Sequence, residues 1–225
     1  MRHFIEELEH LQQKLLEEAG LVEAAIHGSI KALVERDEGP AQDVLRNEAR
    51  INQLEVEIDE TATRLLALQH PMASDLRLIR AASKINTDLE RMGDLAVNIV
   101  ERALGLLQQP VVKPLIDIPQ MASLVEFMVR SSIDAFVKRD ADLARGVLAS
   151  DDAVDDLRDS IYQELIEFMQ RETTSIPASV NLMFVARNLE RIADHATNVA
   201  EDALFVIQAI DVRHGRELHA DEKAG

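Results

Sequence analysis

"DLERMGDLAVNIVERA" at residues 88–103 and "NLERIADHATNVAEDA" at residues 188–203 are nearly the same stretch written twice. Both place apolar residues at the three- and four-residue intervals of an amphipathic helix. Both also keep Glu, Asp and Asn at matching positions. A helix that recurs in this way indicates an internal duplication of the chain.

The duplication extends beyond these two helices. "SIKALVERD" at 29–37 resembles "SIDAFVKRD" at 132–140, and Glu23 falls opposite Glu126. These matches lie 103 positions apart, whereas the two quoted helices lie 100 apart, so the second copy has a shorter connection before its last helix. Two copies of a three-helix unit are the economical explanation, packed either as two bundles side by side or as one longer bundle.

Breaks rich in proline and charge divide the chain into six helical segments, three on each side of the linker "QQPVVKPLIDIP". No useful length alternates with the two-residue period of a strand. The expected segments are 3–37, 41–69, 75–108, 119–139, 141–171 and 177–210. Ser74 is the expected N-cap of the third segment. The second segment of each half could begin with a short separate helix, with Ser150 or Asp151 as the cap of a later start in the second half.

A three-helix bundle of about 100 residues can bury its own core. The sequence therefore predicts an all-α protein of two tandem, homologous three-helix bundles. The first is expected at 1–110 and the second at 111–210, followed by a polar tail at 211–225.

The composition excludes several classes of function. The formal net charge of −17 argues against binding to nucleic acid or anionic lipid, because both attract Lys and Arg. The absence of cysteine excludes disulfides, thiolate zinc sites and a Cys nucleophile. No apolar run approaches the roughly 20 residues of a membrane span, and the N-terminus is acidic and periodic rather than signal-like. We therefore expect a cytoplasmic protein.

The repeated helices carry narrow stripes of acidic and amide side chains. At about 100° per residue, four such side chains of the first copy fall within about 80°. They are Glu90, Asp94, Asn98 and Glu101, repeated in the second copy as Glu190, Asp194, Asn198 and Glu201. The second segment of the first half carries a further stripe of Glu48, Asn52, Glu55 and Asp59. Its counterpart keeps Asp151 and Asp155 but has Arg158 and Tyr162 at the last two positions.

These stripes indicate a cation site if the second and third helices of a half face one another. Four to six carboxylates would then converge, raising their own pKa values or holding a metal. Oxygen ligands suit Mg, Ca, Mn or iron, and His195 or His27 would widen the choice. The alternatives are a solvated surface, or neutralisation of the stripes by Arg91 and Arg191.

Recognisable catalytic motifs are missing, so an enzyme is disfavoured. The chain has no phosphate-binding glycine loop, no His-Glu-x-x-His and no arguable Ser–His–Asp set. Ferritin-like di-iron enzymes need two Glu-x-x-His motifs on facing helices. The sequence has one, Glu7 with His10, away from the repeated stripes.

The stretches "HPMASDLRLI" (70–79), "SKINTDLERMGDLAVNI" (83–99) and "NLERIADHATNVAE" (188–201) resemble the PhoU family, and the resemblance covers essentially the whole chain. It implies two tandem three-helix bundles in a cytoplasmic protein, often a homodimer. The implied role is negative regulation of the phosphate-starvation response and of phosphate uptake. Such a protein would link the ATPase subunit of the phosphate ABC transporter to a sensor histidine kinase, reaching the membrane only through these partners.

The resemblance also implies multinuclear metal clusters on Glu/Asp-x-x-x-Asp motifs, with iron, zinc, manganese or magnesium as the ion. In the first bundle the matching ligands are Glu48, Asn52, Glu55, Glu90 and Asp94. In the second they are Asp151, Asp155, Glu190 and Asp194, where Arg158 and Tyr162 depart from the fuller pattern. Three alternatives remain open: a metal store or carboxylate-bundle enzyme, a scaffold without ligand, and a regulator of another transporter or of persistence and metabolism.

Overall fold

The computed structural model describes residues 2–69, 71–112, 115 and 117–209, and these residues form six long α-helices and one short 3-10 turn, without strands. The elements are α1 (Arg2–Glu35), α2 (Glu38–Gln69), α3 (Ala73–Leu107), α4 (Asp117–Lys138), α5 (Ala141–Arg171), η1 (Thr173–Ser175) and α6 (Ile176–Gln208). The all-α prediction is confirmed. No helix in the described ranges has an apolar stretch of the length that crossing a membrane requires. The predicted polar tail at 211–225 lies outside the described residues.

The first helix of each half ends in the same way, at the "RD" of "VERD" and "VKRD". Arg36 and Arg139 adopt left-handed backbone angles, with φ of 55° and 54°, which stops the helix before them. The aspartate that follows then opens the next helix. Asp140 caps α5 by accepting two first-turn N–H groups at 3.0 Å, and Asp37 accepts one N–H at 2.9 Å at the start of α2.

One expectation about a helix start is wrong, and the open alternative of a short separate helix is decided against, because α2 and α5 are each continuous. Ser74 does not cap α3, because the helix already begins at Ala73 and Ser74 lies inside its first turn. No separate short helix precedes Ser150 or Asp151, because α5 runs unbroken from its Asp140 cap and buries its apolar face from the first turns onward.

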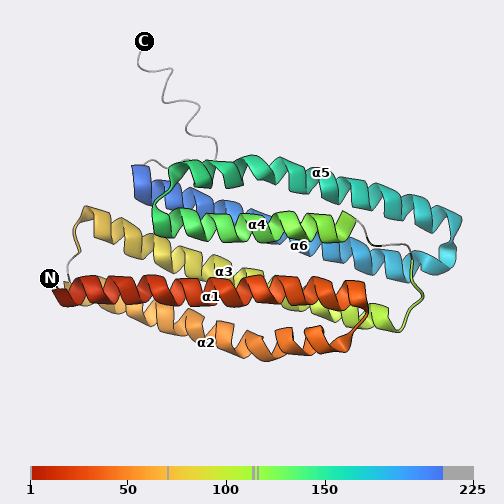
Figure 1. Ribbon diagram of the computed structural model, residues 1–225, viewed down its shortest axis with the longest axis horizontal. Helices are drawn as coiled ribbons and strands as arrows, with labels where there is room; N and C mark the ends of the chain where they lie inside the picture. The colour runs from red at the N-terminus through yellow and green to blue at the C-terminus, as the bar shows by residue number, and fades with distance from the viewer. Residues whose placement is uncertain (1, 70, 113–114, 116, 210–225) are drawn as a thin grey trace, which may run out of the picture.

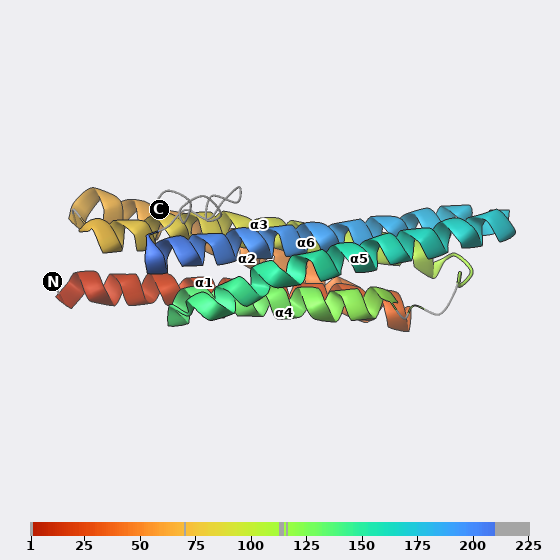
Figure 2. The same cartoon turned by 90° about the horizontal axis from the view of Figure 1, so that it is seen from above.

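The helices form two three-helix units that lie side by side along one long axis (Figure 1). In one unit α1, α2 and α3 pack together, and in the other α4, α5 and α6 do so. The units meet where α3 packs along α6 and α1 packs against α4, as the view from above also shows (Figure 2). The apolar letters of the two quoted stretches are buried in α3 and α6, as the sequence predicted.

The seam between α3 and α6 is antiparallel. Near one end the Lys84 ammonium lies 2.9 Å from the Asp202 carboxylate. Near the other end the Arg102 guanidinium stacks 4.8 Å from the centre of the Phe184 ring. The duplication equates Lys84 with Phe184 and Arg102 with Asp202, so the two ends are equivalent positions filled by different chemistry.

The seam between α1 and α4 has the same approximate two-fold symmetry. The Arg130 guanidinium donates to the Glu23 carboxylate at 2.7 Å, and His27 Nδ1 lies 3.4 Å from a Glu126 oxygen. Glu23 is equivalent to Glu126, and His27 to Arg130. The two halves therefore pack as a pseudo-dimer, each presenting its first and third helices to the other.

Candidate metal centre

The acidic stripes of α2 and α3 face one another in the first bundle. Burial raises the pKa of the half-buried Glu90 carboxyl, and the nearby charges of Asp94 and of Glu55 raise it further. Arg91, which lies 3.4 Å from a Glu90 oxygen, opposes part of this effect. Because Glu55 belongs to α2 and Glu90 to α3, these two carboxylates interact electrostatically across the facing helices.

A third helix contributes a carboxylate that the sequence prediction missed. Glu18 of α1 is completely buried, with 0% of its surface exposed. Neither of its carboxylate oxygens has a hydrogen-bond partner among the described residues. Burial raises its pKa to about 9, and the charges of Glu55 and Glu90 add to the shift. Carboxylates from three helices thus interact electrostatically in this part of the bundle.

Asn86 adds a further buried oxygen beside this group. It lies one turn before Glu90 on α3 and is 1% exposed. Its side-chain amide donates to the backbone carbonyl of Glu55 at 2.9 Å, while its own Oδ1 has no partner among the described residues. Buried polar atoms without partners are costly, and they mark sites where a ligand can supply the missing interaction.

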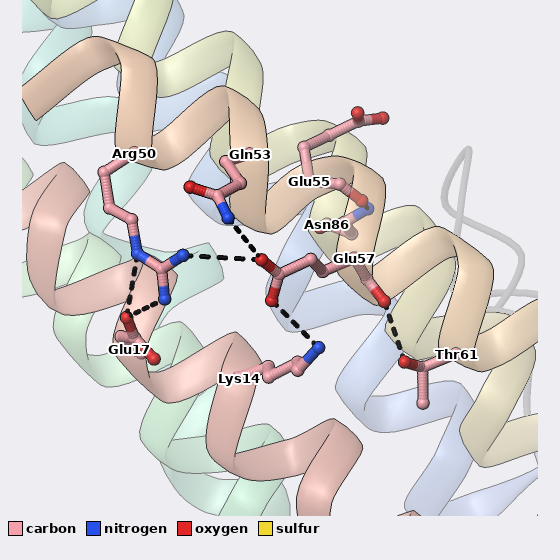
Figure 3. Close-up of polar contacts among 8 residues, drawn as sticks. All are labelled: Lys14, Glu17, Arg50, Gln53, Glu55, Glu57, Thr61 and Asn86. Carbon is pink, nitrogen blue, oxygen red and sulfur yellow. Dashed lines mark hydrogen bonds and ion pairs between the residues drawn. The ribbon is translucent and has the colours of Figure 1, made fainter.

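Glu55 and Glu57 differ in how their charges are met, as Figure 3 shows. The Glu57 carboxylate accepts from Lys14 at 3.0 Å and from Gln53 at 2.8 Å, and the Lys14 hydrogen bond is the largest cause of its lowered pKa. Arg50 approaches the same carboxylate at 3.5 Å. The Glu55 carboxylate points away from this network and has no hydrogen bond or ion pair within the described part of the chain.

Two residues predicted as first-bundle ligands make no side-chain hydrogen bond, among the described residues, with Glu18, Glu55 or Glu90. Glu48 is half-buried and Asn52 exposed, and neither side chain bonds to the facing helix within the described ranges. As the side chains are placed, no three His, Asp or Glu residues of the described chain surround a common point. Binding would therefore involve turning of surface carboxylates such as Asp94 toward the buried Glu18. The unpartnered oxygens fit a hard cation such as Mg²⁺, Mn²⁺ or Fe²⁺.

The predicted ligands of the second bundle also interact electrostatically. Burial raises the pKa of the Asp194 carboxyl, and Glu190, Asp151 and Asp155 raise it further. Here, however, a cation is already supplied by the chain. Arg158 Nη1 lies 2.9 Å from an Asp155 oxygen and 2.9 Å from a Glu190 oxygen.

The histidines considered as further ligands are engaged across the seams between the bundles. His195 Nδ1 lies 2.7 Å from an Asp88 oxygen, and Asn198 donates to the same oxygen at 3.3 Å. His27 lies against Glu126. The imidazoles thus join the two bundles, and His195 also lies near enough to Glu90 to oppose part of the rise in its pKa.

A polar cleft of about 610 Å³ between α2, α3 and α6 is lined by both basic and acidic side chains, which disfavours binding of an anion such as phosphate. Its lining cations are Arg80 and Lys84. Lys84 is paired with Asp202, and Arg80 stacks 5.9 Å from the centre of the Phe205 ring. Acidic side chains, Asp88 among them, line the same cleft and would repel an anion.

A sequence signal for Glu18 existed. Leu11, Leu15 and Val22 mark the apolar face of α1, and Glu18 falls on that face at helical spacing. The duplication also sets it opposite Met121. A charged residue at an apolar position of a repeat is the pattern that would have identified it.

Comparison with known proteins finds the PhoU domain twice in this chain, at residues 15–103 and 118–203. A Pseudomonas aeruginosa protein described as a phosphate-specific transport system accessory protein PhoU homolog is 39% identical over 214 residues, covering 95% of this chain and 88% of that protein. A protein of the same description from Aquifex aeolicus is 40% identical over 217 residues, covering 96% of this chain and 97% of the other.

Two solved structures share the fold over nearly their full length. The crystal structure of PhoU from Pseudomonas aeruginosa matches with a TM-score of 0.89 and 38% identity, covering 92% of this chain and all of that one. The phosphate transport system regulatory protein PhoU from Streptococcus pneumoniae matches with a TM-score of 0.86 and 29% identity, covering 93% and 99%.

Proposed function

This chain belongs to the PhoU family, and from that premise we propose that it is a regulatory accessory protein of a phosphate transport system, not an enzyme. It would act as a negative regulator of the phosphate-starvation response and so control phosphate uptake. The observation that carries this proposal is the match of both three-helix units to the PhoU domain, together with relatives described as transport accessory proteins.

Within this role the protein would be an adaptor in signal transduction. It would dock onto the ATPase subunit of the phosphate ABC transporter and onto a sensor histidine kinase in the cytoplasm, keeping the kinase in its signalling-off mode when phosphate is plentiful. The net charge of −17 supports docking to basic protein surfaces. Assembly as a homodimer is part of the proposal.

The acidic group of the first bundle would hold a cation that regulates this docking. Glu55, Glu90 and Asp94 would bind iron, zinc, manganese or magnesium, and the buried Glu18 would be a further ligand. Glu48 and Asn52 also remain predicted ligands. When bound, the metal supplies the positive charge that the stripe lacks. The carboxylates would then hold α2 against α3, so that metal binding contributes directly to folding free energy.

The predicted ligands of the second bundle do not fit a cation as they are arranged. Asp151, Asp155, Glu190 and Asp194 are close together, but Arg158 bonds to two of them. The proposed regulation therefore involves no metal bound in the second bundle.

The test of the regulatory role is alkaline phosphatase output in phosphate-rich medium. We expect high output in a strain that lacks this chain, and silencing when the chain is restored, because the kinase would lose its restraint. Complementation with Glu90→Gln/Asp94→Asn then reports on the cation's part. Output that stays low in the deletion strain would contradict the proposed regulation and favour another transporter or pathway.

A further inference from the structure

The two bundles differ at the positions that build the carboxylate group. Glu18 of the first is equivalent to Met121 of the second, and both are fully buried. Asn86 is equivalent to the buried Ala186. Every buried oxygen that lacks a partner in the first site therefore has an apolar counterpart in the second, which leaves the second site no buried ligand to offer.

The exposed half of the second site differs as well. Arg158 stands where the first bundle has Glu55, and its side chain is only 23% exposed. Its guanidinium bridges Asp155 on its own helix α5 to Glu190 on α6, and Nη2 and Nε also bond to Asp159 at 2.9 and 3.0 Å. It therefore joins the second and third helices of its bundle, as a cation between Glu55 and Glu90 would join α2 and α3.

Two like-charged stripes that face one another need a positive group between them. In the second bundle that group is a guanidinium, whose charge is permanent and whose fork fits two carboxylates at once. In the first bundle Arg91 lies 3.4 Å from Glu90 and 3.6 Å from Asp94, but its side chain is 59% exposed and both carboxylates belong to its own helix. Among the described residues, no cation of the chain bridges Glu55 on α2 to Glu90 on α3.

We propose that cation binding in this protein is one-sided: the first bundle binds a divalent cation through Glu18 together with Glu55, Glu90 and Asp94, while Arg158 permanently takes the cation's place in the second bundle. The inference rests on the cation binding proposed above. Under this proposal only the first bundle responds to metal. The second bundle keeps the same structure with or without metal and packs against α1 and α3.

The test is a titration of the full-length, chelator-stripped protein with Mn²⁺, followed by calorimetry and by metal analysis after gel filtration. Two matched variants separate the sites. Glu90→Gln/Asp94→Asn removes the first site and is expected to abolish binding, whereas Glu190→Gln/Asp194→Asn is expected to leave both stoichiometry and affinity unchanged. Glu18→Gln is expected to weaken binding roughly 10- to 100-fold, with Met121→Gln as its silent control.

A gain-of-site variant gives an independent readout. Arg158→Glu places at position 158 the acidic residue that the first bundle has at the equivalent position 55, and we expect a second class of Mn²⁺ site to appear. Arg158→Lys keeps the positive charge and should add no site. Hydrogen exchange provides a structural measure, since Mn²⁺ should slow exchange in α2 and α3 of the parent protein and leave α5 unchanged.

The outcomes distinguish this inference from the cation proposal on which it rests. Loss of part of the bound Mn²⁺ in Glu190→Gln/Asp194→Asn, or slowed exchange in α5, would overturn one-sided binding while leaving the cation proposal intact. A parent protein that binds no Mn²⁺ at any accessible concentration would overturn both.

Discussion

At the scale of single residues, Glu18 is the side chain that least suits a protein built for stability alone. A buried carboxyl without a hydrogen-bond partner destabilises the folded state whether it is ionised or holds a proton. Met121 occupies the same position of the other bundle without that cost. Retaining Glu18 where methionine would fit is consistent with a ligand that satisfies it in the functional protein.

Replacement of Glu18 by Met should stabilise the metal-free protein in a pH-dependent way. The folded pKa of about 9 lies above the ordinary value of 4.5, so between these values the folded state holds a proton that the unfolded chain has released. The free energy of unfolding therefore falls as pH rises through this window. Glu55 on α2 and Glu90 on α3 face the group and strengthen the effect.

The measurement is urea unfolding in chelator at pH 5 and pH 8. We expect the gain from Glu18→Met to be roughly 2–4 kcal/mol larger at pH 8 than at pH 5. Glu17→Met, which removes an exposed ion pair with Arg50, should lower stability by no more than about 1 kcal/mol and by the same amount at both pH values. Equal gains from Glu18→Met at the two pH values would show that the buried carboxyl does not titrate in this window.

At the scale of elements, the approach of α1 to α2 is set by a glycine. A Cβ added at Gly28 would lie 2.8 Å from the Val44 Cγ2 atom, nearer than ordinary packing allows. At Gly20, two turns earlier on the same helix, an added Cβ would meet nothing within 4 Å. The first glycine is therefore needed for close packing, whereas the second only lowers helix propensity.

These two positions make a matched pair of alanine substitutions. Gly28→Ala should lower the free energy of unfolding by about 1–3 kcal/mol, because Val44 or the helices must shift. Gly20→Ala should raise it by roughly 0.5–1 kcal/mol through better helix propensity. Both values come from thermal or urea unfolding of the purified chain, and a stabilising Gly28→Ala would contradict the tight α1–α2 contact.

At the scale of the whole molecule, the two bundles are held together by polar contacts along an apolar seam. The Asp202 side chain is only 9% exposed and is paired with the Lys84 ammonium of the other bundle. Asp88 and His195 form a second link, with 2.7 Å between their polar atoms. Lys84 and Asp202 place charges of opposite sign on opposite bundles, and both links favour one register of the bundles.

Removal of the Lys84 amine should therefore loosen the seam. Lys84→Met leaves the nearly buried Asp202 carboxylate without this partner, and we expect a loss of about 1–2 kcal/mol, discounted because the Lys84 side chain is 37% exposed. Lys138→Met, which breaks an exposed pair within α4, should cost less than about 0.5 kcal/mol. Urea unfolding gives both numbers, and hydrogen exchange along α3 and α6 should rise only for Lys84→Met.

Most of the fold could be read from local patterns. The helical periods, the "RD" stops at Arg36 and Arg139, and the proline-rich linker place all six helices, with starts differing by only a few residues. The exception at Ser74 arose because several residues near a helix start can serve as its cap in sequence, and only the backbone decides among them.

The sequence by itself determined the duplication, the amphipathic faces and the acidic stripes, because each depends on residues within a few turns of one helix. Only the tertiary structure decided which side chains lie beside the acidic stripes, namely Glu18 in the first bundle and Arg158 in the second. Burial of Glu18 depends on α1 closing over α2 and α3, and the bridging role of Arg158 depends on how far α6 lies from α5. Electrostatic interactions act through space between helices, so their partners are fixed by packing and not by spacing along the chain.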